Sequence, residues 1–105
     1  MKLIDEEPWR WSLFEDSGDL YLDVLCSHSA VDYRFPILLD AQEVSEFRET
    51  GRDALNRLAQ AVHYSAPGVI GNNSRYRGRK VSEAIDMRIR EATFKEIQKA
   101  QQSAT

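Results

Sequence analysis

The chain contains a single cysteine, Cys26, so no disulfide can form within it. No apolar run approaches the roughly 20 residues that a membrane-spanning helix needs. The first eight residues become acidic at once and lack the basic start and apolar stretch of a signal peptide. These absences predict a protein of the reducing cytoplasm that has no membrane partner.

Residues for catalysis and metal binding are also scarce. Cys26 and His28 form the one close pair of soft metal ligands, whereas a zinc site needs three or four ligands. An enzyme with Cys26 as nucleophile and His63 as its partner is a further hypothesis. Strand parity, however, sets Trp9 opposite Cys26 and directs the thiol into the core, where it acts as a small hydrophobe. We therefore expect a protein that is not an enzyme and uses no metal or cofactor.

Charge is plentiful but unevenly divided along the chain. Residues 1–50 carry four basic and twelve acidic side chains, a net charge of −8. Residues 51–105 carry ten basic and five acidic side chains, a net charge of +5. An asymmetry of this kind indicates partners rather than a fold, and it favours a binding protein.

Apolar residues alternate with polar ones over residues 9–39, which predicts antiparallel strands. Turn signals separate them at residues 16–19 and 27–30. Pro36 cannot donate a ladder hydrogen bond, so the last strand should lie at a sheet edge. The predicted strands cover residues 9–15, 20–26 and 31–39.

The positions of the two turns predict the strand register. The first hairpin pairs Leu13 with Leu22, and the second pairs Leu22 with Phe35. Both turns then place the apolar residues on one face of the sheet. On the opposite face, Asp23 should lie directly across from Arg34, a pair that contributes about 0.2–1 kcal/mol.

Helical signals begin at Asp40, because Asp40 and Glu43 have the spacing of a capping box. Helical spacing then continues over residues 41–63 through Gly51, which predicts either one helix kinked there or two shorter helices. A last helix is predicted at about residues 81–100, with Phe94 and Ile97 as possible members of its buried stripe.

These elements predict a single α+β domain, a three-stranded antiparallel meander with two helices packed on one sheet face. Residues 1–8 should form an N-terminal arm and residues 101–105 a frayed tail. Between the helices, residues 64–80 form a long basic loop, which is uncommon without a function or a strand of its own.

The basic loop offers the sharpest local feature. Arginine and lysine around one tyrosine can hold phosphate and stack a base, so a nucleic-acid-binding regulator is the alternative function. The same arginines can instead pair with carboxylates of a partner, or of the chain's own acidic half. The acidic total charge makes nucleic acid the less favoured partner. The residues concerned are Arg75, Tyr76, Arg77, Arg79 and Lys80.

Several runs together suggest a family. They are Trp11-Ser12-Leu13-Phe14-Glu15-Asp16, the run from Leu20-Tyr21-Leu22-Asp23 to Ala30, Leu39 with Glu43-Val44, Gly51, and Leu55 with Leu58-Ala59. In size and order of elements, residues 9–66 resemble small bacterial immunity proteins of polymorphic-toxin and contact-dependent growth inhibition systems. The resemblance implies a cytoplasmic protein that binds and blocks a cognate toxin domain, often a nuclease, as a heterodimer.

An acidic surface would be steered electrostatically towards the cationic cleft of a nuclease. Exposed aromatic residues beside the acids would then serve as anchors. The register places Phe14 and Tyr21 on the second sheet face. They are exposed there unless the N-terminal arm or the last helix covers them. The predicted toxin contacts are Phe14, Asp16, Asp19, Tyr21 and Asp23.

Overall fold

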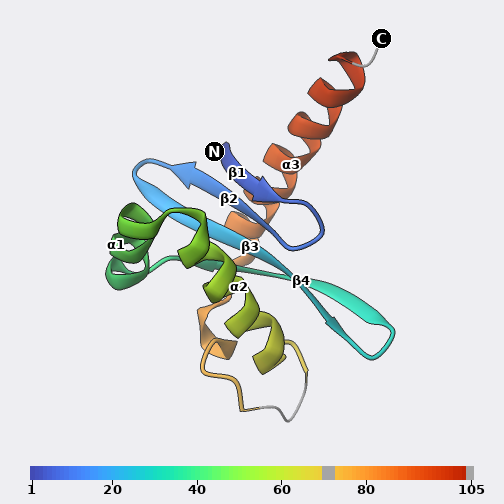
Figure 1. Cartoon of the computed structure of the whole chain (residues 1–105). Coiled ribbons are helices and arrows are strands. Elements are labelled where there is room, and N and C mark those ends of the chain that lie inside the picture. Colours follow the sequence, from blue (N-terminus) through green and yellow to red (C-terminus); the bar gives the residue numbers. More distant parts are fainter. Residues whose placement is uncertain (70–72, 104–105) are drawn as a thin grey trace.

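The computed structural model describes residues 1–69 and 73–103. Those residues form a four-stranded antiparallel sheet, three α-helices and one 3₁₀ turn, which confirms the α+β class (Figure 1). In chain order the elements are β1 (Lys2–Glu7), β2 (Trp11–Asp16), β3 (Asp19–His28), β4 (Val31–Leu38), α1 (Ala41–Thr50), α2 (Arg52–Ser65), η1 (Arg77–Arg79) and α3 (Glu83–Ser103).

The N-terminal residues are a strand, so the prediction of an arm at residues 1–8 was wrong. Strand β1 pairs antiparallel with β2 and forms one edge of the sheet, whose order is β1-β2-β3-β4. Sequence alternation did not reveal this strand, because an edge strand of this sheet needs little apolar surface. Leu3 packs against the core on the second sheet face, and acidic residues follow it. Arg52 of helix α2 holds two of them, Asp5 and Glu7.

The predicted register holds in the first hairpin, where Leu13 pairs with Leu22. In the second hairpin it is wrong by two residues, since Leu22 pairs with Ile37 instead of Phe35. The cause is that β3 runs on to His28, so the turn is centred later in the chain. A shift of two residues leaves every side chain on its predicted face, and the core composition is preserved.

Helices α1 and α2 cover the first face of the sheet. The capping box is formed, with Asp40 accepting from the Glu43 backbone N–H at 2.8 Å and Glu43 accepting from the Asp40 N–H at 2.9 Å. Gly51 has a φ of 66° and separates two helices, which decides between the two predicted alternatives. The main core lies beneath them and includes Leu13, Leu22 and Leu55.

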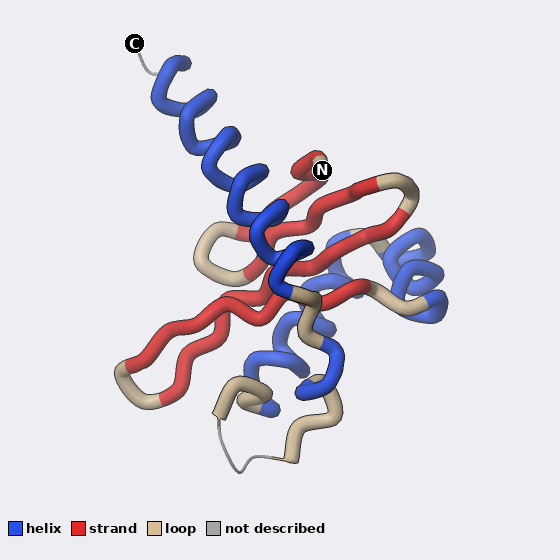
Figure 2. The backbone as a smooth tube through the Cα atoms, turned by 180° about the vertical axis from the view of Figure 1, so that it is seen from behind, coloured by secondary structure: helices blue, strands red, loops and turns tan. Residues whose placement is uncertain are grey.

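Helix α3 covers the second face, so the prediction that both helices pack on one face was wrong (Figure 2). The chain reaches that face by passing the β4 edge, where the Val81 N–H donates to the Pro36 carbonyl at 3.0 Å. Pro36 thus lies on an edge strand as predicted. Ile89 and Ala92 of α3 pack against Phe14 and the second face.

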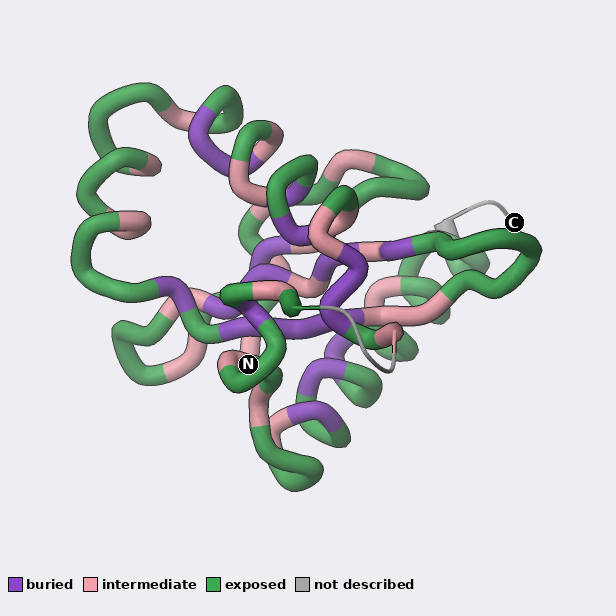
Figure 3. Tube along the Cα trace, turned by 90° about the horizontal axis from the view of Figure 1, so that it is seen from below, coloured by how far each residue is buried: buried purple, intermediate pink, exposed green. Residues whose placement is uncertain are grey.

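The second half of α3 extends beyond the sheet (Figure 1). Phe94 and Ile97 are therefore exposed instead of completing the buried stripe. Residues 101–103 continue the helix rather than fraying, and residues 104–105 lie outside the described residues. Buried positions concentrate in the strands and on the sheet-facing turns of the helices (Figure 3).

Candidate functional site

The predicted toxin contacts do not form an open surface. Phe14 is 1% exposed and Tyr21 7% exposed, because α3 and β1 cover them in a second, smaller core. Asp16 is half-buried and pairs with Arg88 and with the N-terminal amino group. Of the five residues, Asp19 alone is fully at the surface. Burial of Phe14 and Tyr21 therefore contradicts their prediction as toxin contacts.

Asp23, the remaining member, belongs to an ion cluster between the sheet and α3. Its Oδ2 lies 2.8 Å from Arg34 Nε, and Arg34 also reaches Asp86 at 3.1 Å. Arg90 holds the other oxygen of Asp86 at 2.9 Å. The Asp23 Oδ1 atom is buried without a hydrogen-bond partner. Burial raises the pKa of Asp23 above its usual value, and Arg34 only partly offsets this.

Part of the charge asymmetry of the sequence is neutralised within the fold. Arg52 contacts Asp5 and Glu7, and Arg79 contacts Glu43. Arg88 likewise contacts an acid of the first half. Basic residues of the second half thus pair with acids of the first half. For the loop arginines, this pairing was one of the alternatives that the sequence left open.

The basic loop is mostly built into the fold, and residues 70–72 of it lie outside the described residues. Tyr76 is 3% exposed and belongs to the main core, so its ring faces are not available to a base. Arg79 donates to both Glu43 oxygens at 2.6 and 2.8 Å, which raises the pKa of Arg79. Arg75, Arg77 and Lys80 are exposed. The predicted nucleic-acid set is therefore divided between core and surface.

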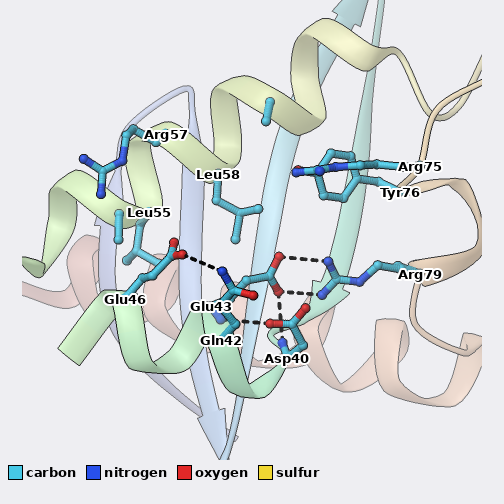
Figure 4. Close-up of a pocket in the computed structure, with 12 residues that line it drawn as sticks. Asp40, Gln42, Glu43, Glu46, Leu55, Arg57, Leu58, Arg75, Tyr76 and Arg79 are labelled. Atoms are coloured by element: carbon cyan, nitrogen blue, oxygen red, sulfur yellow. Dashed lines mark hydrogen bonds and ion pairs between the residues drawn. The ribbon is translucent and has the colours of Figure 1, made fainter. Parts of the chain in front are cut away.

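A pocket of about 450 Å³ opens between α1, α2 and residues 75–79 (Figure 4). Figure 4 shows Arg79 meeting Glu43 in the pocket, with Arg75 lying over Tyr76 beside them. Three acids and three arginines line this mixed-charge pocket, together with Leu55 and Leu58 of α2. The acids are Asp40, Glu43 and Glu46, and the arginines are Arg57, Arg75 and Arg79.

Another pocket, of about 270 Å³, lies between the β1–β2 turn and α2, and we call it the aromatic pocket. Trp9 and Tyr64 line it and are 89% and 79% exposed. Trp9 has a φ of 68°, a left-handed conformation that is unusual for a bulky residue. At the pocket floor, the Trp11 indole N–H donates to Asn56 Oδ1 at 2.8 Å.

Sequence reasoning missed Trp9. The parity argument placed it opposite Cys26 in the core, but β2 begins only at Trp11 and its pairing with β3 ends at Trp11 and Val24. A three-residue turn, Pro8 to Arg10, interrupts the alternation. Pro8 was the signal available, because proline commonly occupies such turns.

The burial of Cys26 argues against the hypothesis of a reactive cysteine. Cys26 is completely buried, and burial raises its pKa to about 11, the opposite of what an activated thiolate requires. His63 Nδ1 accepts a hydrogen bond from the Ser27 backbone N–H at 3.4 Å. Across residues 1–69 and 73–103, no three His, Cys, Asp or Glu residues gather in a way that could hold a metal ion. None of the helices in that described part is long and apolar enough to cross a membrane.

Comparison with known proteins gives no relative: no family model, no curated protein and no solved structure matches the chain. The candidate site is therefore defined by geometry alone. Helix α2 separates the two pockets, with Leu55 and Leu58 on one side and Asn56 and His63 on the other.

Proposed function

We propose that this chain is a binding protein of the immunity type, which docks on a toxin domain through the face formed by α1, α2 and the β1–β2 turn. The observation that carries the proposal is the pair of exposed aromatic residues, Trp9 and Tyr64, on one pocket. Exposing a tryptophan to water is unfavourable, and holding it in a left-handed conformation adds about 1–3 kcal/mol. A partner that buries Trp9 would recover the apolar part of this cost.

The composition of the aromatic pocket favours a protein as partner. Tryptophan, tyrosine and arginine dominate the energetic hot spots of protein interfaces, and hot spots cluster around pockets that exclude water. Trp9, Tyr64 and Arg10 supply these three residue types. Gln60 and His63 add polar groups that can fix the orientation of the partner.

Exposed acids on the same face supply an electrostatic rim. Glu46 and Glu49 of α1 and Asp53 of α2 are exposed. An acidic rim steers association with a cationic partner and raises the association rate. A nuclease toxin with a basic substrate cleft therefore fits the proposal, and occlusion of that cleft is the proposed mechanism of inhibition.

A growth assay combined with calorimetry tests the proposal. The partner to use is the C-terminal domain of a large protein encoded upstream of the gene for this chain. Co-expression of the chain should restore growth of cells that produce this domain, and the two purified proteins should form a one-to-one complex. An upstream gene without a toxin-like C-terminal domain, or a toxin that still kills, would contradict the immunity role.

Variants locate the surface. Replacing Trp9 and Tyr64 by alanine should weaken binding by at least about 100-fold, because each is expected to be a hot spot. Phe94→Ala is the matched control, since Phe94 is 59% exposed but lies on α3, across the sheet. If the aromatic-pocket variants bind as tightly as Phe94→Ala and the wild type, the aromatic pocket is not part of the interface.

A further inference from the structure

We infer that the mixed-charge pocket receives a single carboxylate side chain of the protein partner and that Arg75 binds it. This inference rests on the proposed function and adds the chemistry of a second contact. It also gives a role to Arg75, which lines this pocket without forming an ion pair with its acids.

Arg75 is held ready for an anion. Its guanidinium carbon lies 4.8 Å from the centre of the Tyr76 ring, and one of its nitrogens donates to the Tyr76 hydroxyl at 2.6 Å. Tyr76 is itself fixed in the core, so the guanidinium is oriented by a rigid support. Among the described residues, no carboxylate lies within ion-pair distance of Arg75. A guanidinium has five N–H donors, and the tyrosine contact uses one of them.

Arg79 next to it has a different role. It donates to both oxygens of Glu43 and to the Leu38 carbonyl at 2.7 Å, so its donors face the fold. These contacts join the segment before α3 to α1 and β4. Arg79 is thus a positioning residue for the pocket wall, while Arg75 remains available to a ligand.

The surroundings favour one carboxylate over phosphate or nucleic acid. Asp40 and Glu46 line the same pocket and would repel a dianion or a phosphate chain. A lone carboxylate gains a two-pronged contact with arginine and suffers less repulsion. Leu55 and Leu58 provide an apolar wall for the carbon atoms of the incoming residue. Because α2 lies between the two pockets, a partner that reaches both would straddle this helix.

A peptide titration followed by NMR tests the pocket without the toxin. N-acetyl-Glu-Leu-amide should shift the Arg75 side-chain N–H signal and the amide signal of Ala61, which also lines the pocket, and these shifts should saturate. The neutral N-acetyl-Gln-Leu-amide should bind about tenfold more weakly or not at all. Arg75→Gln should abolish the difference between the peptides and Arg75→Lys should reduce it, because lysine lacks the planar fork. Arg48→Gln, an exposed arginine of α1 outside the pocket, is the matched control.

Two results would overturn the inference: equal binding of both peptides, and stronger shifts of the same signals by inorganic phosphate or an oligonucleotide. Absence of any shift at Arg75 would also overturn it. With the toxin domain, Arg75→Gln should raise the Kd by about 10- to 100-fold and reduce its dependence on salt. If Trp9→Ala weakens this complex but Arg75→Gln does not, the proposed function stands and the carboxylate contact is wrong. If the peptides bind but no toxin domain does, the carboxylate site stands and the proposed function is wrong.

Discussion

Arg34 Nε lies 2.8 Å from Asp23 Oδ2, although these two residues are not opposite each other in the sheet. Arg34 pairs in register with Leu25, and Asp23 pairs with Pro36, so the ion pair is diagonal. The diagonal direction lets Arg34 reach Asp86 of α3 as well. One arginine therefore contacts two acids between the sheet and the helix.

Asp23→Asn should change the pH dependence of stability. Because burial raises the Asp23 pKa in the folded state, the folded protein binds a proton more readily than the unfolded chain does. Between the usual pKa of 3.8 and the raised value, this group therefore stabilises the fold as pH falls. Asp23→Asn should remove that component, seen in urea unfolding at several pH values. Asp19→Asn, at an exposed acid, is the control.

At pH 7, Asp23→Asn should leave the free energy of unfolding within about 1 kcal/mol of the wild type, since the variant removes a desolvated charge together with an ion pair. Arg34 keeps its contact with Asp86 in this variant. A loss of several kcal/mol would show that the pair stabilises the fold by more than its desolvation costs.

Gly51→Ala should destabilise the protein by about 1–3 kcal/mol, because alanine is strained in that backbone conformation. Gly51 has a φ of 66° and a ψ of −136°, although a Cβ atom there would meet no neighbour. Gly78→Ala is the matched control, since its site is equally open and its φ lies outside the left-handed region. Chemical denaturation of the two variants should separate them, and an equal loss would argue against strain at Gly51.

Trp9→Gly should stabilise the fold and weaken partner binding at the same time. Glycine adopts a φ of 68° without strain, and Trp9 contributes little packing because it is so exposed. We expect a gain of about 0.5–1 kcal/mol in thermal unfolding and a large loss of affinity for the toxin domain. A variant that loses stability would mean that Trp9 supports the turn instead of serving a partner.

Cys26 should be unreactive in the folded protein. With its pKa raised to about 11, well under 1% of the thiol is ionised at pH 8, and the side chain is completely buried. Alkylation by iodoacetamide should be at least about 100-fold faster in denaturing urea than in buffer, followed by mass spectrometry. Comparable rates in the two conditions would revive the hypothesis of a cysteine nucleophile.

Local signals were read correctly from the sequence, and signals that depend on distant contacts were not. The capping box at Asp40 and Glu43 involves neighbours three residues apart, so its chemistry is visible in the chain. Helix α3 lies on the second sheet face because the chain passes around the β4 edge, where the Val81 N–H donates to the Pro36 carbonyl. No periodicity within residues 81–100 records that contact, since a buried stripe looks the same on either face.

The candidate site was harder to predict than the fold. Alternation correctly placed the side chains of β2 and β3 on their faces, but it was extended back to Trp9, which lies in the turn that begins at Pro8. Exposure of Phe14 and Tyr21 depended on whether α3 covered them, which sequence reasoning left open. Arg75 and Arg79 share a loop and a chemistry, and only their neighbours in space, Tyr76 and Glu43, give them different roles.

The path of the chain around β4 also bears on aggregation. An uncovered edge strand can pair with an edge of another molecule. On β4, Pro36 offers no N–H, its carbonyl already accepts from Val81, and Ile37 forms a bridge with Lys80. The opposite edge is β1, whose acids repel a like-charged copy. The segment that carries Arg75 therefore also shields the part of β4 around Pro36 and Ile37 from strand addition, and loosening it should promote self-association.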